Sequence, residues 1–83
     1  MLTVSVISPE RTLFEGQVEA VTAPAFDGEV GILTSHAPMM TLLGKGTLRL
    51  GADGSKGRFE VEGGFLQVVD NTVRVVTEKA TAL

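Results

Sequence analysis

The sequence predicts an all-β fold, an antiparallel sandwich or barrel with little helix. Three observations support this class: ten glycines, many valines and threonines, and no long stretch with helical periodicity. Valine and threonine favour strands because their branched side chains fit the pleated surface of a sheet. Turn signals separate short extended runs about every 8 to 12 residues, which is typical of sandwiches and barrels. There is no internal repeat or linker, so we expect a single domain over residues 1–83.

The first part of the chain predicts two strands joined by a turn. Residues 2–7 alternate apolar and polar side chains, which is the period of a half-buried strand. Pro9 marks a turn, and residues 12–23 form a second extended segment. Apolar residues change parity within this segment. We therefore expect a β-bulge at Gly16 or at the pair 19–20 to reset the buried face.

The next part is less regular. Residues 24–28 carry turn signals, and residues 29–34 follow as a short strand. Gly31 inside that strand predicts another backbone passing close to it. Pro38 lacks a backbone donor and opens a poor strand sequence. We therefore expect a single helical turn beginning near Pro38 and capped by Ser35.

The second half predicts one more strand and then a hairpin. Residues 47–50 alternate with leucines inward, and residues 52–57 form a polar loop. Residues 58–78 contain the clearest hairpin of the chain. The Gly63-Gly64 pair interrupts its first strand. Asp70-Asn71 separates its two arms and suits a two-residue turn that requires positive φ.

Composition excludes several classes of function. A net charge of −3 with no basic run longer than two residues argues against binding to nucleic acid. The absence of cysteine excludes disulfides and thiolate metal sites, and favours an intracellular setting. No apolar run approaches the roughly 20 residues that span a bilayer, and no signal peptide is apparent. We therefore expect a soluble protein that is not exported.

The residues offer little for chemistry. Asp27 and Glu29 share a face of an extended strand and lie near His36, which would allow a small metal-dependent enzyme as one hypothesis. A zinc site needs three or four ligands, and no second histidine completes one, so a structural or interface histidine is favoured. Ser35 and His36 point to opposite sides of an extended chain and make a poor nucleophile and base pair. We expect no cofactor, no metal and no catalytic residue.

An interaction surface is the better interpretation. Four large apolar residues, Met39, Met40, Leu42 and Leu43, fall within five positions. A domain this small would struggle to bury all of them, and an apolar patch left exposed on a monomer usually marks a protein partner. From these residues alone, a small β-sandwich adaptor would account for the pattern.

Three stretches resemble the ε subunit of bacterial F-type ATP synthase, called δ in mitochondria. "DGEVGILTSHAPMMTLL" (27–43) is similar to the family's G-E-x-G-x-L-P-G-H-A-P-L-L, with Thr34-Ser35 in place of Pro-Gly. "LTVSVISPERTLFEGQVEAVTAP" (2–24) resembles the family's opening, S-P-E-x-x-x-F-x-G-x-V. "FEVEGGFLQVVDNTVRVVTEKA" (59–80) is similar to F-x-V-x-G-G-F-x-E-V-x-x-N-x-V-x-V-L-x-D-x-A. The stretches cover nearly the whole chain in the right order.

This resemblance implies a flattened, antiparallel two-sheet β-sandwich. It implies a non-catalytic subunit of the central stalk, part of the rotor, that binds γ and the c ring and helps couple proton translocation to ATP turnover. Such a subunit would lie peripherally on the cytoplasmic side of the cell inner membrane, held there only through the complex. Most members add a C-terminal helical hairpin that can inhibit ATP hydrolysis. The sequence ends at Leu83, so we expect the fold without this hairpin.

The resemblance also implies two contact surfaces, which we assign by position. One would meet the c ring: Asp27, Gly28, Glu29 and Gly31. The other would meet γ: Ser8, His36, Pro38, Met39, Met40 and Leu42.

Overall fold

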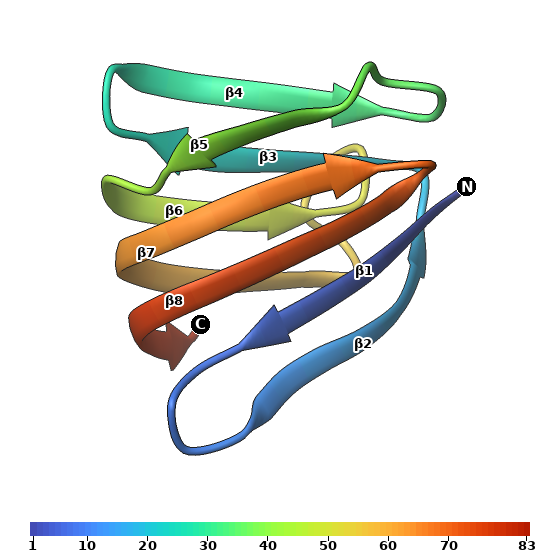
Figure 1. Ribbon diagram of the computed structural model, residues 1–83. Coiled ribbons are helices and arrows are strands. Elements are labelled where there is room, and N and C mark those ends of the chain that lie inside the picture. The colour runs from blue at the N-terminus through green and yellow to red at the C-terminus, as the bar shows by residue number, and fades with distance from the viewer.

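The computed structural model describes residues 1–83, which form eight strands and no helix (Figure 1). The structure therefore contains no helix that is long and apolar enough to cross a membrane. The predicted all-β class is confirmed. The strands are β1 (Leu2–Ile7), β2 (Thr12–Val18), β3 (Ala20–Ala25), β4 (Gly28–Leu33), β5 (Met39–Leu42), β6 (Lys45–Leu50), β7 (Gly57–Val69) and β8 (Thr72–Ala82).

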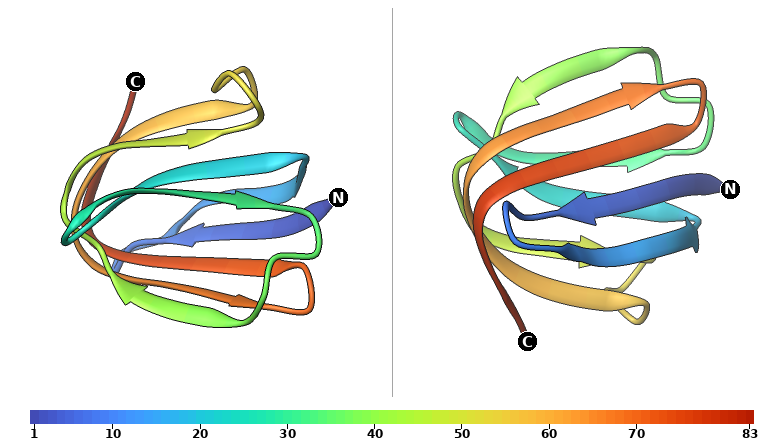
Figure 2. Two further views of the ribbon diagram at one scale, coloured as in Figure 1. Left: turned by 90° about the horizontal axis from the view of Figure 1, so that it is seen from above. Right: turned by 60° about the horizontal axis from the view of Figure 1, so that its bottom comes forward.

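The strands form two facing layers that share β7 and β8. One layer, the front sheet, contains β5, the second half of β7, the first half of β8, β1 and β2. The other, the back sheet, contains β4, β3, β6, the first half of β7 and the end of β8. Hydrogen bonding is continuous from one layer to the other because β7 and β8 curve between them (Figures 1 and 2). The result is the predicted two-sheet β-sandwich, antiparallel as expected except for β1 and β8, which pair in parallel.

The bend in β7 occurs at two glycines. Gly63 and Gly64 have φ values of 73° and 102°, which side chains with a Cβ rarely adopt. A Cβ on Gly64 would also overlap the carbonyl oxygen of Val76 on β8. We expected these glycines to interrupt the strand. Instead β7 continues through them and changes layer, pairing with β6 before the bend and with β5 after it.

The chain also crosses between the sheets at Glu19. β2 ends at Val18 in the front sheet and β3 begins at Ala20 in the back sheet. The predicted change of buried parity at residues 19–20 is confirmed, but its cause is the crossing and not a bulge. The Glu19 carboxylate accepts a hydrogen bond from the Ala52 N–H at 2.8 Å, which ties the crossing to the loop after β6.

The core lies between the two layers and draws on both. Alternate residues of each strand point into it, as the sequence pattern predicts. Burial of these side chains is the main stabilising term for a domain without disulfides. The sixteen core residues are Leu2, Val4, Val6, Val18, Val21, Ala23, Ile32, Leu43, Leu48, Leu50, Phe59, Val61, Leu66, Val68, Val73 and Val75.

Two local expectations are wrong. The helical turn near Pro38 does not form: residues 39–42 are strand β5, paired with β7 from Met39 opposite Val68. A single turn of helix is costly to nucleate, and pairing with a distant strand outweighs it. The predicted close backbone approach at Gly31 is also absent, because the space that a Cβ would occupy there is open. The predicted turn at Asp70-Asn71 is confirmed, with φ values of 49° and 59°.

Candidate docking surfaces

Four apolar side chains form a row across the outer face of the front sheet. Leu42 on β5 lies opposite Phe65 on β7, Phe65 opposite Val76 on β8, and Val76 opposite Ile7 on β1. Partners at one register position project from the same face of a sheet. In the sequence, each of the four is adjacent to a core residue that is fully or nearly buried. None of the four belongs to the core or packs against it. We call Ile7, Leu42, Phe65 and Val76 the apolar row.

The apolar row is bordered by residues of mixed character. Met40 lies two residues from Leu42 on the same face of β5, and these two side chains are 65% and 63% exposed. Met40 pairs with Gln67, and Gln67 with Arg74, so a more polar row runs beside the apolar one. Phe26 donates its backbone N–H to the Leu42 carbonyl at 3.1 Å and is 68% exposed. An apolar strip with a polar border is the usual anatomy of a protein interface.

The residues that the resemblance assigns to γ contact do not all face this surface. Met40 and Leu42 do. Met39 points the other way and packs against the core. Pro38 is exposed in the segment that joins β4 to β5. Ser8 lies in the turn after β1, where its N–H donates to the Arg11 carbonyl at 2.9 Å.

Three members of the apolar row were missed by the sequence reasoning. Ile7, Phe65 and Val76 lie on strands whose alternate residues are in the core, so their parity marks them as outward-facing. The sequence signal that could have identified them is a large apolar residue at an outward position of a strand with alternating burial. Their alignment with Leu42 in one row depends on pairing between strands that are far apart in the sequence.

The histidine lies in a turn whose groups bond mainly to one another. The His36 N–H donates to the Leu33 carbonyl at 3.1 Å, and Nδ1 lies 2.7 Å from the Ala37 carbonyl. A carbonyl only accepts, so Nδ1 carries the proton in this contact, and neutral His36 presents Nε2 as a free acceptor. The Ser35 N–H donates to Asn71 Oδ1 at 2.6 Å.

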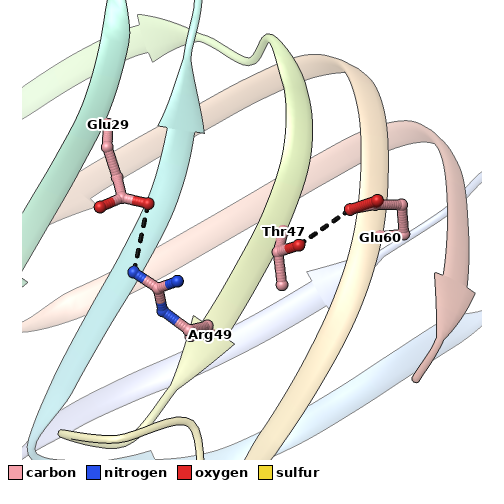
Figure 3. Close-up of polar contacts among 4 residues, drawn as sticks. All are labelled: Glu29, Thr47, Arg49 and Glu60. Carbon is pink, nitrogen blue, oxygen red and sulfur yellow. Dashed lines mark hydrogen bonds and ion pairs between the residues drawn. The ribbon is translucent and has the colours of Figure 1, made fainter.

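A second surface surrounds the β3–β4 turn on the outer face of the back sheet. Phe26 and Asp27 form the tip of this hairpin, and Gly28, the first residue of β4, has a φ of 134°. The Glu29 carboxylate forms an ion pair with Arg49 of β6 at 3.1 Å (Figure 3). Their side chains are 58% and 39% exposed, so the pair contributes little to stability. It does orient the Glu29 carboxylate toward β6.

Further across the same face the side chains are polar and interlinked. Thr47 Oγ1 donates to Glu60 Oε1 at 3.0 Å (Figure 3). Lys45 lies opposite Glu62, which lies opposite Lys79. Charges of alternating sign on neighbouring strands favour one another and leave no apolar strip. This face therefore differs in kind from the outer face of the front sheet.

Nothing in the structure supports a chemical site. No three His, Asp or Glu side chains come together as a metal site would require, so Asp27, Glu29 and His36 do not form one. The one depression is open, has a volume of about 150 Å³ and is bordered mostly by charged side chains. Ligand sites are usually larger and mainly apolar. Hydrogen bonds from the Ser55 side chain and N–H lower the pKa of Asp53, which lies in an exposed loop away from both surfaces.

Comparison with known proteins gives a consistent result. The model of the family "ATP synthase, Delta/Epsilon chain, beta-sandwich domain" matches residues 1–83. The ATP synthase epsilon chain of Leptospira borgpetersenii is 44% identical over 77 residues, which are 93% of this chain and 61% of that protein. The ATP synthase epsilon chain of a Synechococcus species is 44% identical over 79 residues, 95% of this chain and 58% of that protein. The chain thus spans about three fifths of these relatives.

Solved structures agree. A chain in the cryo-EM structure of the Euglena gracilis mitochondrial ATP synthase, OSCP/F1/c-ring in rotational state 1, matches with a TM-score of 0.86 and 25% identity. The match covers 98% of this chain and 52% of that one. A chain in the Tetrahymena thermophila mitochondrial ATP synthase central stalk/c-ring structure matches with a TM-score of 0.79 and 20% identity. That match covers 96% and 65% of the two chains and supports the fold alone.

Proposed function

Because this chain belongs to the ATP synthase delta/epsilon β-sandwich family, we propose that it serves in the central stalk of an F-type ATP synthase. It is a rotor component that binds γ and the c ring and helps couple proton translocation to ATP synthesis and hydrolysis. It contributes no catalytic group. It lies peripherally on the cytoplasmic side of the inner membrane, attached through the complex. The family match over residues 1–83 leaves no ground for the alternative of an unrelated adaptor.

The observation that supports γ binding best is the apolar row. Its side chains lie on the outer face of a sheet and outside the core: Leu42 is 63% exposed, and Ile7, Phe65 and Val76 are half-buried, so a partner could cover the surface that they leave accessible. Covering an exposed leucine stabilises a complex by about 1.5 to 3 kcal/mol. Met40 beside the row is flexible and adapts to an irregular apolar partner. The outer face of the front sheet therefore provides the γ contact, with Met40 and Leu42 near its edge.

The β3–β4 turn is the better candidate for the c ring. It presents two acidic side chains, Asp27 at its tip and Glu29 near the start of β4, beside the exposed ring of Phe26. Charged groups of this kind suit polar loops at a membrane surface, where they set orientation and specificity more than affinity. The apolar row lies on the front sheet and Glu29 on the back sheet, and the two proposed contacts adjoin where Phe26 of the turn bonds to Leu42.

Co-elution with γ tests the proposed function. We expect this chain and the γ subunit of the same organism to form a complex in size-exclusion chromatography at micromolar concentration. Neither component should hydrolyse ATP in the absence of α and β. Separate elution of the two proteins at that concentration would contradict the proposal.

A charge reversal tests the c-ring assignment. We expect Glu29→Lys to lower the protons pumped per ATP hydrolysed by roughly a factor of two to five in the assembled enzyme, since it reverses a charge at a rim contact. The free energy of unfolding of the chain should change by less than about 1 kcal/mol, because the Arg49 pair is exposed.

Asp53→Lys is the control for this experiment. It changes the net charge by the same amount, and Asp53 lies in the loop joined to Ala20, at the opposite end of β3 from Glu29. We expect normal coupling from this variant. Equal coupling in the Glu29→Lys, Asp53→Lys and unmodified enzymes would exclude Glu29 from the c-ring contact.

A further inference from the structure

One asparagine joins three elements at one end of the sandwich. Asn71 is the second residue of the β7–β8 turn, with a φ of 59°. Its backbone carbonyl accepts a hydrogen bond from the Thr3 N–H of β1 at 2.8 Å. Its side-chain Oδ1 accepts another from the Ser35 N–H at 2.6 Å. Asn71 therefore connects the turn it occupies to β1 and to the segment between β4 and β5.

That segment, residues 34–38, has little else to hold it. It contains no strand, and the His36 N–H bonds to the Leu33 carbonyl just before it. The His36 ring bonds within the segment, to Ala37. Ser35 has a φ of 69°, a conformation that costs free energy for any residue with a Cβ. The bond from Ser35 to Asn71 is thus the segment's one hydrogen bond to a residue beyond itself and β4.

We infer that the Asn71 side chain is a positioning residue: it fixes the conformation of residues 34–38 and so aligns His36 and the start of β5 for γ binding. The inference rests on the proposed function, because γ is the partner whose affinity it sets. Ordering a loop before association removes part of the free energy that binding would otherwise spend on it. Loss of the Asn71 acceptor should therefore weaken binding without unfolding the domain.

Two substitutions at Asn71 separate the role of its side-chain acceptor from its role in the turn. Asn71→Gly produces an Asp-Gly pair, a preferred sequence for two-residue turns with positive φ, and it removes only the side-chain acceptor. Asn71→Asp keeps an oxygen acceptor for the Ser35 N–H, and aspartate also tolerates positive φ. If Asn71 only shaped the turn, both variants would behave like the unmodified chain.

The test combines amide hydrogen exchange by NMR with titration calorimetry against the γ subunit. For Asn71→Gly we expect faster exchange of the Ser35 amide, a melting temperature close to that of the unmodified chain, and γ affinity reduced roughly three- to tenfold, the range expected for one hydrogen bond. Asn71→Asp should restore slow exchange and bind within about twofold of the unmodified chain.

The outcomes separate the two claims. Equal γ affinity of the unmodified and Asn71→Gly chains would overturn the positioning role and leave the proposed function intact. Unchanged Ser35 exchange in Asn71→Gly would overturn it as well. Failure of the unmodified chain to bind γ would overturn the proposed function, and the inference with it.

Discussion

Gly64→Ala should destabilise the chain by more than about 3 kcal/mol. The added Cβ would overlap the Val76 carbonyl and lie about 2.8 Å from the Thr77 Cα, and both are backbone atoms that cannot rotate away. The φ of 102° adds conformational strain. A domain of this size has a total stability of about 4 to 12 kcal/mol, so the substitution removes much of it. Urea denaturation measures the change.

Gly31→Ala is the matched control. Gly31 lies in a strand, its φ is not positive, and the space its Cβ would fill is open. We expect its midpoint in urea to stay level or rise slightly, because alanine restricts the unfolded chain by about 0.4 to 1 kcal/mol. Equal midpoints for the Gly31 and Gly64 variants would show that the bend in β7 does not require a glycine.

Leu42→Asp should weaken γ binding by roughly 30-fold or more. The substitution removes one exposed apolar side chain of the row and places a carboxylate where the partner would have to desolvate it. Because Leu42 is 63% exposed in the free chain, its free energy of unfolding should change little. Titration calorimetry measures the affinity, and thermal unfolding confirms that the variant is folded.

Leu33→Asp controls for the charge and for the loss of a leucine. Leu33 is 64% exposed, almost the same as Leu42, but it lies on β4 in the back sheet. The outer face of that sheet is not assigned to γ, so we expect binding within about twofold of the unmodified chain. Similar losses from both variants would place the γ contact elsewhere or reduce it to a nonspecific effect of charge.

Most of the fold could be predicted from the sequence because its signals are local. Alternation in residues 2–7 and 58–62 specifies which side chains enter the core, and Asp70-Asn71 specifies a tight turn. The strand after Pro38 cannot be predicted from its own residues, because it forms by pairing with Val68 and its neighbours, far along the chain. The Gly63-Gly64 pair predicts a break because a strand that changes layer has the same glycine signal as one that ends.

The docking surface was only partly predictable. The cluster of apolar residues at 39–43 indicates an interaction surface. The structure shows which of these residues are buried and which are exposed. Leu43 enters the core and Met39 packs against it, while Met40 and Leu42 remain exposed. The row that Leu42 joins is assembled by the pairing of four strands, a register that no local window of sequence contains.

A footprint of the γ subunit on this chain would show which face of the sandwich γ covers. Amide and methyl NMR signals would be followed during titration with γ of the same organism. We predict protection and shift changes on the outer face of the front sheet, centred on Leu42, Phe65 and Val76. Residues on the outer face of the back sheet, such as Thr47 and Glu60, should stay unchanged. A footprint on the back sheet instead, or no change at saturating γ, would show that the outer face of the front sheet is not the γ contact.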